Sequence, residues 1–112
     1  MILAVDIGNT NVVLGCIEGE QILFLERMAT DRRATAMEYL VRIRSVLKFR
    51  DIDPEKLEGA IICSVVPIVT MQVRPAVEQL TGKQAVVIGV IQALVATLFV
   101  DAALLAVHLI MP

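Results

Sequence analysis

Aromatic residues and positive charge are both scarce in this sequence. Its 112 residues include no tryptophan, one tyrosine and three phenylalanines, and the formal net charge is −2. Proteins that bind single-stranded nucleic acids usually stack the bases on aromatic side chains, and nucleic-acid backbones are bound by basic surfaces. The sequence provides neither feature, so its composition argues against a nucleic acid as the partner.

The sequence has two cysteines, and its start does not show the pattern of a secretory signal. Cys16 and Cys63 lie far apart, match no metal-binding or redox spacing, and each stands in an apolar run. We expect both to be free thiols buried in the core. Met1 leads directly into an apolar run, without the basic segment and cleavage site of a secretory signal. The expected compartment is therefore the cytoplasm.

Apolar residues are present in excess, at 57% of the chain against 20% charged residues. Such an excess indicates a sheet buried on both faces, a membrane segment or a surface that binds a partner. A chain of this length is sufficient for one domain with a modest core. It is too short for an enzyme of two domains with a cleft between them.

The apolar pattern predicts an α/β fold with a mixed sheet and helices packed on it, in the order β-β-β-α-β-α-β. The predicted strands are 2–5, 12–17, 21–28, 60–66 and 85–88. One helix is predicted after residue 31, and its apolar face comprises Tyr39, Leu40, Ile43, Val46 and Leu47. A second helix is predicted from Pro67 to Leu80, with Gly82 closing it.

The stretch 91–112 differs in character from the rest of the chain. It is almost entirely alanine, valine, leucine and isoleucine, with Asp101 near its middle. A membrane-spanning helix needs about 20 apolar residues, and a carboxylate at its centre costs roughly 2.5–3.5 kcal/mol. We therefore expect a phosphate-binding domain over 1–90 and an apolar helical tail over 91–112, rather than a membrane anchor.

The segment that can carry chemistry is D-I-G-N-T-N, at positions 6–11. A carboxylate at the end of a buried strand can hold a hydrated divalent cation beside phosphates. A glycine lets the backbone approach an anion and accepts unusual φ and ψ angles, and successive amides can point into one concavity. Threonine and asparagine add side-chain donors. The predicted phosphate-binding residues are Asp6, Gly8, Asn9, Thr10 and Asn11, with Asp6 also at the metal.

The same six residues also fit an ordinary hairpin turn. In such a turn, glycine and asparagine serve only to supply positive φ angles. Short glycine motifs match by chance often enough that these residues alone leave both interpretations open.

Three segments together resemble the type III pantothenate kinases, which belong to the actin, sugar kinase and Hsp70 superfamily of ribonuclease-H-like folds. They are M-I-L-A-V-D-I-G-N-T-N at the start, T-D-R-R-x-T-x-x-E-Y at 30–39, and S-V-V-P at 64–67. The resemblance covers residues 1–89 and implies the N-terminal half of an actin-like ATPase fold. Within the third segment, we expect Ser64 and Pro67 to shape a strand-to-helix turn.

The resemblance implies ATP-dependent phosphorylation of pantothenate, the first step of coenzyme A biosynthesis. It further implies Mg²⁺ and a monovalent cation such as K⁺ as cofactors, and a homodimer as the assembly. In that family the first motif binds phosphate, so this role is carried over to the residues of this chain from Asp6 to Asn11 named above.

The residues of the second segment also have simpler expected roles. Thr30, Asp31 or Thr35 is expected to cap the following helix, because short polar side chains accept hydrogen bonds from free helix amides. Arg32 and Arg33 are expected to be solvated, as most surface charges are.

Beyond residue 89 the sequence departs from the family. No G-A-D-R-like motif, which supplies the base and the pantothenate contacts in the family, and no second Asp-x-Gly-Thr motif follows. Asp101 lacks the flanking glycine and arginine, and His108 is isolated in an apolar run, so we expect neither to be catalytic. We expect a truncated or frame-shifted, inactive kinase. The alternatives are a non-catalytic regulatory or interaction protein of the same fold, and a small membrane-anchored protein.

Overall fold

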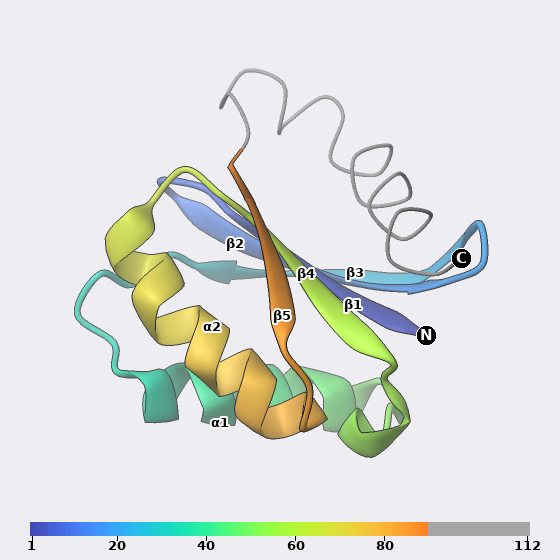
Figure 1. Ribbon diagram of the computed structural model, residues 1–112. Coiled ribbons are helices and arrows are strands. Elements are labelled where there is room, and N and C mark those ends of the chain that lie inside the picture. Colours follow the sequence, from blue (N-terminus) through green and yellow to red (C-terminus); the bar gives the residue numbers. More distant parts are fainter. Residues whose placement is uncertain (90–112) are drawn as a thin grey trace.

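The computed structural model describes residues 1–89, which form one five-stranded mixed sheet with two α-helices (Figure 1). The strands are β1 Ile2–Ile7, β2 Asn11–Glu18, β3 Gln21–Ala29, β4 Gly59–Ser64 and β5 Ala85–Gly89. The helices are α1 Ala36–Phe49, the short 3₁₀ helix η1 Pro54–Lys56, and α2 Pro67–Thr81. The predicted order of elements is confirmed. The predicted tail over 91–112 lies outside the described residues, and it stays a prediction together with the domain boundary at residue 90.

The sheet brings the ends of three parallel strands to one edge. Its strand order is β3-β2-β1-β4-β5, with β1 antiparallel to β2 and parallel to β4, and β4 parallel to β5. Parallel strands end at the same edge of a sheet. Figure 1 shows the β1–β2 turn and the β4–α2 loop at this edge, where the Val65 amide donates to the Ile7 carbonyl oxygen at 3.1 Å. The sheet therefore brings the first and third signature segments together.

Strand β1 is buried on both of its faces, as a continuous apolar run predicts. Its odd-numbered residues Leu3, Val5 and Ile7 belong to the main core cluster, to which both helices contribute. Figure 1 shows α1 and α2 on the same side of the sheet. Because side chains alternate along a strand, Asp6 lies on the opposite face. The packing of the odd-numbered residues thus fixes the direction of the Asp6 side chain.

A capping box begins helix α1. Thr35 is the N-cap: its hydroxyl accepts a hydrogen bond from the Glu38 amide at 3.2 Å, and the Glu38 carboxylate accepts one from the Thr35 amide at 3.3 Å. Of the three predicted candidates, Thr35 is therefore the cap. Asp31 accepts from the Arg33 amide at 3.0 Å in the preceding loop, and Thr30 contacts the β1–β2 turn instead.

The β4–α2 loop has the form expected for a strand-to-helix turn. Pro67 occupies the first position of α2, where its missing amide costs nothing. The Ser64 hydroxyl accepts hydrogen bonds from the Val66 amide at 3.0 Å and the Thr70 hydroxyl at 2.6 Å. Gly82 ends the helix, as predicted, and its φ angle is 70°. The structural roles predicted for Ser64 and Pro67 are confirmed.

Both cysteines lie in the part of the chain that the structure describes. Cys16 and Cys63 are free and buried, as predicted. None of the helices in this part of the chain has the length and apolar character needed to cross a membrane. The stretch considered as an anchor, 91–112, falls outside the described residues.

Candidate nucleotide-phosphate site

The D-I-G-N-T-N segment lies at the carboxyl end of β1, beside the end of β4. Asp6 and Ile7 are the last residues of β1, Gly8, Asn9 and Thr10 form the turn, and Asn11 begins β2. Ligands of open α/β sheets bind beyond the carboxyl ends of parallel strands, where the strand order reverses direction. The segment thus occupies the position in the sheet where a ligand is expected.

Asp6 is a buried carboxyl group that lacks a partner within residues 1–89. The residue is 8% exposed, and its Oδ1 atom makes no hydrogen bond there. Burial raises the pKa of the Asp6 carboxyl group from 3.8 to about 6, because desolvation disfavours the charged form. Buried polar groups nearly always have partners, so an unpaired one in a ligand-binding position suggests a ligand.

The residues around Asp6 fit a hydrated cation better than a fully protein-bound one. No group of three or more His, Cys, Asp or Glu side chains that could hold a metal occurs in the described part of the chain. Mg²⁺ keeps several of its waters and is usually held by one or two carboxylates together with substrate phosphates. The single orphaned Asp6 oxygen therefore suits Mg²⁺.

Position 8 favours glycine because there is little room for a side chain there, and not because the backbone has a positive φ angle. The positive φ angles within residues 1–89 belong to Gly19, Asp51 and Gly82. The alternative in which Gly8 and Asn9 supply positive φ angles is therefore wrong. A Cβ atom added to Gly8 would lie 3.2 Å from the carbonyl oxygen of Asn11, closer than an ordinary contact. Glycine lets the two ends of the turn approach each other.

The amides of the turn do not all point into one concavity, which corrects the expectation from the sequence. The Gly8 amide donates to the Asn11 carbonyl oxygen at 2.9 Å, because this bond closes the turn. The amides of Asn9 and Thr10 make no hydrogen bond to any acceptor within residues 1–89, and both residues are exposed. The amides available to an anion are therefore those at the tip of the turn.

The second signature segment contacts this turn directly, which the sequence does not reveal. The Thr30 hydroxyl donates to the Gly8 carbonyl oxygen at 2.7 Å, and the Arg32 guanidinium donates to the side-chain oxygen of Asn9 at 3.0 Å. Arg32 and Arg33 are both exposed, as expected, but the Arg32 guanidinium also contacts the turn. Two segments about twenty residues apart meet because β2 and β3 form a hairpin that returns the chain to its starting edge.

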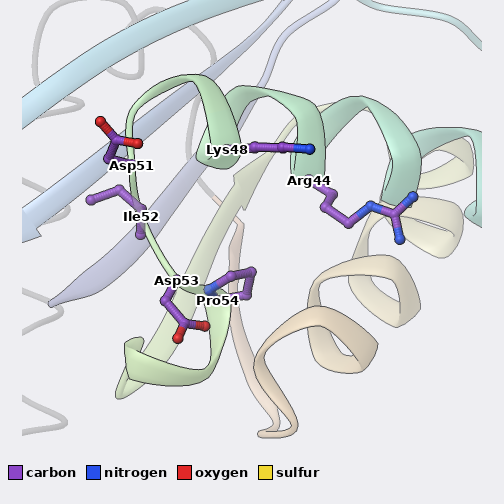
Figure 2. Close-up of a pocket in the computed structure, with 6 residues that line it drawn as sticks. All are labelled: Arg44, Lys48, Asp51, Ile52, Asp53 and Pro54. Atoms are coloured by element: carbon purple, nitrogen blue, oxygen red, sulfur yellow. The ribbon is translucent and has the colours of Figure 1, made fainter.

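Two surface pockets lie outside the turn. One, of about 390 Å³, lies between the last turns of α1 and the start of η1; Figure 2 shows the basic Arg44 and Lys48 on the helix and the acidic Asp51 and Asp53 on the segment that follows it. Because η1 leads into the start of β4, this pocket is at the opposite edge of the sheet from Asp6. The other, of about 290 Å³, is lined by Ser64, Pro67, Thr70, Met71, Arg74 and Val87. Neither pocket includes a predicted phosphate-binding residue.

Comparisons with known proteins agree on one family. The family model described as type III pantothenate kinase matches residues 2–102, which extends past the predicted boundary at residue 90. The type III pantothenate kinase of Moorella thermoacetica is 37% identical over 89 residues, covering 80% of this chain and 35% of that protein. That of Thermus thermophilus is 40% identical over 88 residues, covering 79% and 34%. The chain thus spans about a third of the length of these relatives.

Solved structures share the fold. The ROK hexokinase from Thermus thermophilus matches with a TM-score of 0.59 at 14% identity, covering 79% of this chain and 33% of that one. A likeness at this identity concerns the fold alone. The chain therefore has the mixed-sheet, ribonuclease-H-like fold of actin-like sugar kinases, as the sequence resemblance implied.

Proposed function

Because the chain belongs to the type III pantothenate kinase family, we propose that it supplies the phosphate-binding part of an ATP-dependent phosphorylation of pantothenate. This reaction is the first step of coenzyme A biosynthesis. The observation that carries the proposal is the buried Asp6 Oδ1 atom, which has no hydrogen-bond partner within residues 1–89, beside a turn whose Asn9 and Thr10 amides make no hydrogen bond in the same part of the chain. Such a pair of features suits a phosphate group together with its counter-ion.

Each residue of the motif has a distinct proposed part in binding. The amides of Asn9 and Thr10, with the side chains of Thr10 and Asn11, would donate hydrogen bonds to phosphate oxygens. Asp6 would hold Mg²⁺ through its water ligands, and the ion would neutralise charge on the phosphates. Gly8 lets the turn close without a side chain in the way. Phosphoryl transfer depends mainly on such positioning and charge neutralisation.

Other properties of the whole enzyme are proposals that rest on family membership. They are pantothenate and ATP as substrates, a homodimer, a requirement for K⁺ or another monovalent cation, and a cytoplasmic location. The 112-residue sequence contains no G-A-D-R-like motif to provide the base and the pantothenate contacts. We therefore propose that these 112 residues, tested alone, bind Mg-ATP without completing the reaction.

Isothermal titration and an activity assay test both parts of this proposal. Titration of the purified chain with Mg-ATP is expected to give measurable heat, and Asp6→Asn is expected to weaken binding by about tenfold or more, because a hydrogen bond to a charged group contributes about 1.5–3 kcal/mol. A coupled assay with pantothenate and ATP is expected to show no turnover. Normal turnover would contradict the second part. Absence of binding heat would contradict the first and favour the non-catalytic interaction protein.

A further inference from the structure

We propose that the segment Thr30–Arg32 is the positioning device of the phosphate-binding turn. Its hydrogen-bond donors bind the carbonyl oxygens of the turn. These bonds set the direction of the amide groups that an anion would contact. This inference rests on the proposed function, because the direction of these amides matters for binding only if a phosphate group occupies the turn.

Thr30 makes two hydrogen bonds to the turn. Its hydroxyl donates to the carbonyl oxygen of Gly8 at 2.7 Å, and its amide donates to the carbonyl oxygen of Thr10 at 2.9 Å. The hydroxyl bond is partly buried. Water therefore competes with it less than with an exposed bond.

Arg32 adds a second attachment, to the residue between these two. Its guanidinium donates to the carbonyl oxygen of Asn9 at 3.4 Å and to the side-chain oxygen of Asn9 at 3.0 Å. The last carbonyl of the turn, that of Asn11, accepts from the Gly8 amide at 2.9 Å. Every carbonyl oxygen from residue 8 to residue 11 thus accepts a hydrogen bond from this chain.

Because of the geometry of the peptide group, these contacts also determine the direction in which the amides of the turn point. A peptide is planar and trans, so its C=O and N–H point in opposite directions. The Gly8 carbonyl belongs to the same peptide as the Asn9 amide, and the Asn9 carbonyl to the same peptide as the Thr10 amide. Drawing both carbonyls toward Thr30 and Arg32 therefore aims the two amides away from that segment. The carbonyl oxygens, which carry partial negative charge, then point away from an anion that binds these two amides.

The segment is itself anchored to helix α1. The hydroxyl of Tyr39, which is fully buried, accepts from the Asp31 amide at 2.9 Å and donates to the Asp31 carbonyl oxygen at 2.8 Å. The Asp31 carboxylate also lies 3.2 Å from the Arg42 guanidinium. The backbone between Thr30 and Arg32 is therefore fixed to the helix, and the turn takes its shape from this support.

The experiment combines titration with Mg-ATP and two-dimensional NMR of the amides of the full chain. Thr30→Val removes the hydroxyl donor with little change in volume, and Thr30→Ser restores it. Loss of one such hydrogen bond is expected to weaken Mg-ATP binding by about three- to tenfold. In the nucleotide-free protein, Thr30→Val is expected to shift the Asn9 and Thr10 amide resonances, and Thr30→Ser to return both binding and resonances toward the original values.

Arg32→Gln tests the second attachment, with Arg44→Gln as the matched control on an exposed residue of α1 at the far edge of the sheet. Arg32→Gln is expected to weaken binding by about threefold, since exposed charged contacts contribute little. Arg44→Gln is expected to leave binding and the turn resonances unchanged. If Thr30→Val does not fold, Arg32→Gln tests the inference in its place, because it removes the guanidinium contacts to Asn9. Unchanged binding together with unshifted turn amides would then overturn the inference.

The outcomes separate this inference from the proposed function. If the unaltered chain does not bind Mg-ATP, the proposed function fails, but the resonances of the free protein still test the positioning role. The inference is overturned if Thr30→Val folds with unshifted turn amides and unchanged binding. It is equally overturned if Thr30→Ser behaves like Thr30→Val, because the hydroxyl is then not the cause.

Discussion

At the scale of single residues, the carboxyl group of Asp6, the proposed metal-binding residue, lowers the stability of the fold when it ionises. Its carboxyl group is buried without a partner in the described part of the chain, and its pKa is raised to about 6. A carboxyl group whose pKa is higher in the folded state than in the unfolded state destabilises the fold when it ionises. The cost is therefore absent below about pH 4 and fully present above about pH 6.

Asp6→Asn is expected to remove this pH dependence. In the presence of a chelator, the free energy of unfolding of the unaltered chain should fall relative to that of the variant between pH 4 and pH 7.5, by up to about 3 kcal/mol. Urea unfolding across this pH range measures the difference, and groups such as Asp31 cancel because both proteins contain them. If the free energies of unfolding of the two proteins changed with pH in parallel, the raised pKa of Asp6 would be contradicted.

At the scale of elements, helix α1 depends on its first turn as well as on its buried face. Its N-terminus carries a capping box between Thr35 and Glu38, and its buried residues are Tyr39, Leu40, Ile43 and Leu47. The cap provides a partner for amides that an isolated helix leaves free. Because the Tyr39 hydroxyl binds both the amide and the carbonyl oxygen of Asp31, α1 also anchors the segment that contacts the proposed phosphate-binding turn.

Thr35→Ala is expected to destabilise the protein by about 1 kcal/mol, as loss of an N-cap does. Ser45→Ala is the matched control, since it removes a hydroxyl group from the exposed middle of the same helix. The control should be neutral or slightly stabilising, because alanine favours the helix interior. Urea unfolding measures both changes, and equal effects would mean that the capping box does not stabilise α1.

At the scale of the whole molecule, one core unites the sheet with both helices. The main cluster of buried residues contains side chains from β1, β2, β4, α1 and α2. A shared core of this kind predicts a single cooperative transition, in which secondary structure and core packing are lost together. Tyr39 is the only tyrosine, tryptophan is absent, and the ring is fully buried, so tyrosine fluorescence reports on the surroundings of this one core residue.

Leu47→Ala is expected to lower the free energy of unfolding by about 2–5 kcal/mol, because it leaves a cavity in this core. Tyrosine fluorescence and circular dichroism should still give coincident transitions. Leu23→Ala, at a half-exposed position on β3, is the control and should cost much less. If Leu47→Ala is too unstable to study, Ile43→Val makes a smaller cavity in the same cluster. Transitions that separate would contradict a single core.

The sequence by itself determined the order of the elements and the position of the candidate site along the chain. Apolar periodicity, the glycine at the end of α2 and the proline at its start are local signals, because each depends on neighbouring residues along one element. The family resemblance of the three signature segments is also local, since it is carried by short runs of sequence. The buried state of both cysteines followed from the apolar runs around them.

Only the tertiary structure decided which groups of the site are free and which are occupied. The Gly8 amide is used to close the turn, and Thr30 and Arg32 reach the turn from more than twenty residues away. Hydrogen bonds between distant segments depend on how β1, β2 and β3 pair, including the register shift between Cys16 and Ile17, and the sequence pattern did not predict this shift. That Asp6 Oδ1 has no partner among residues 1–89 likewise depends on packing from neighbouring strands, so the sequence could place the carboxylate but not its surroundings.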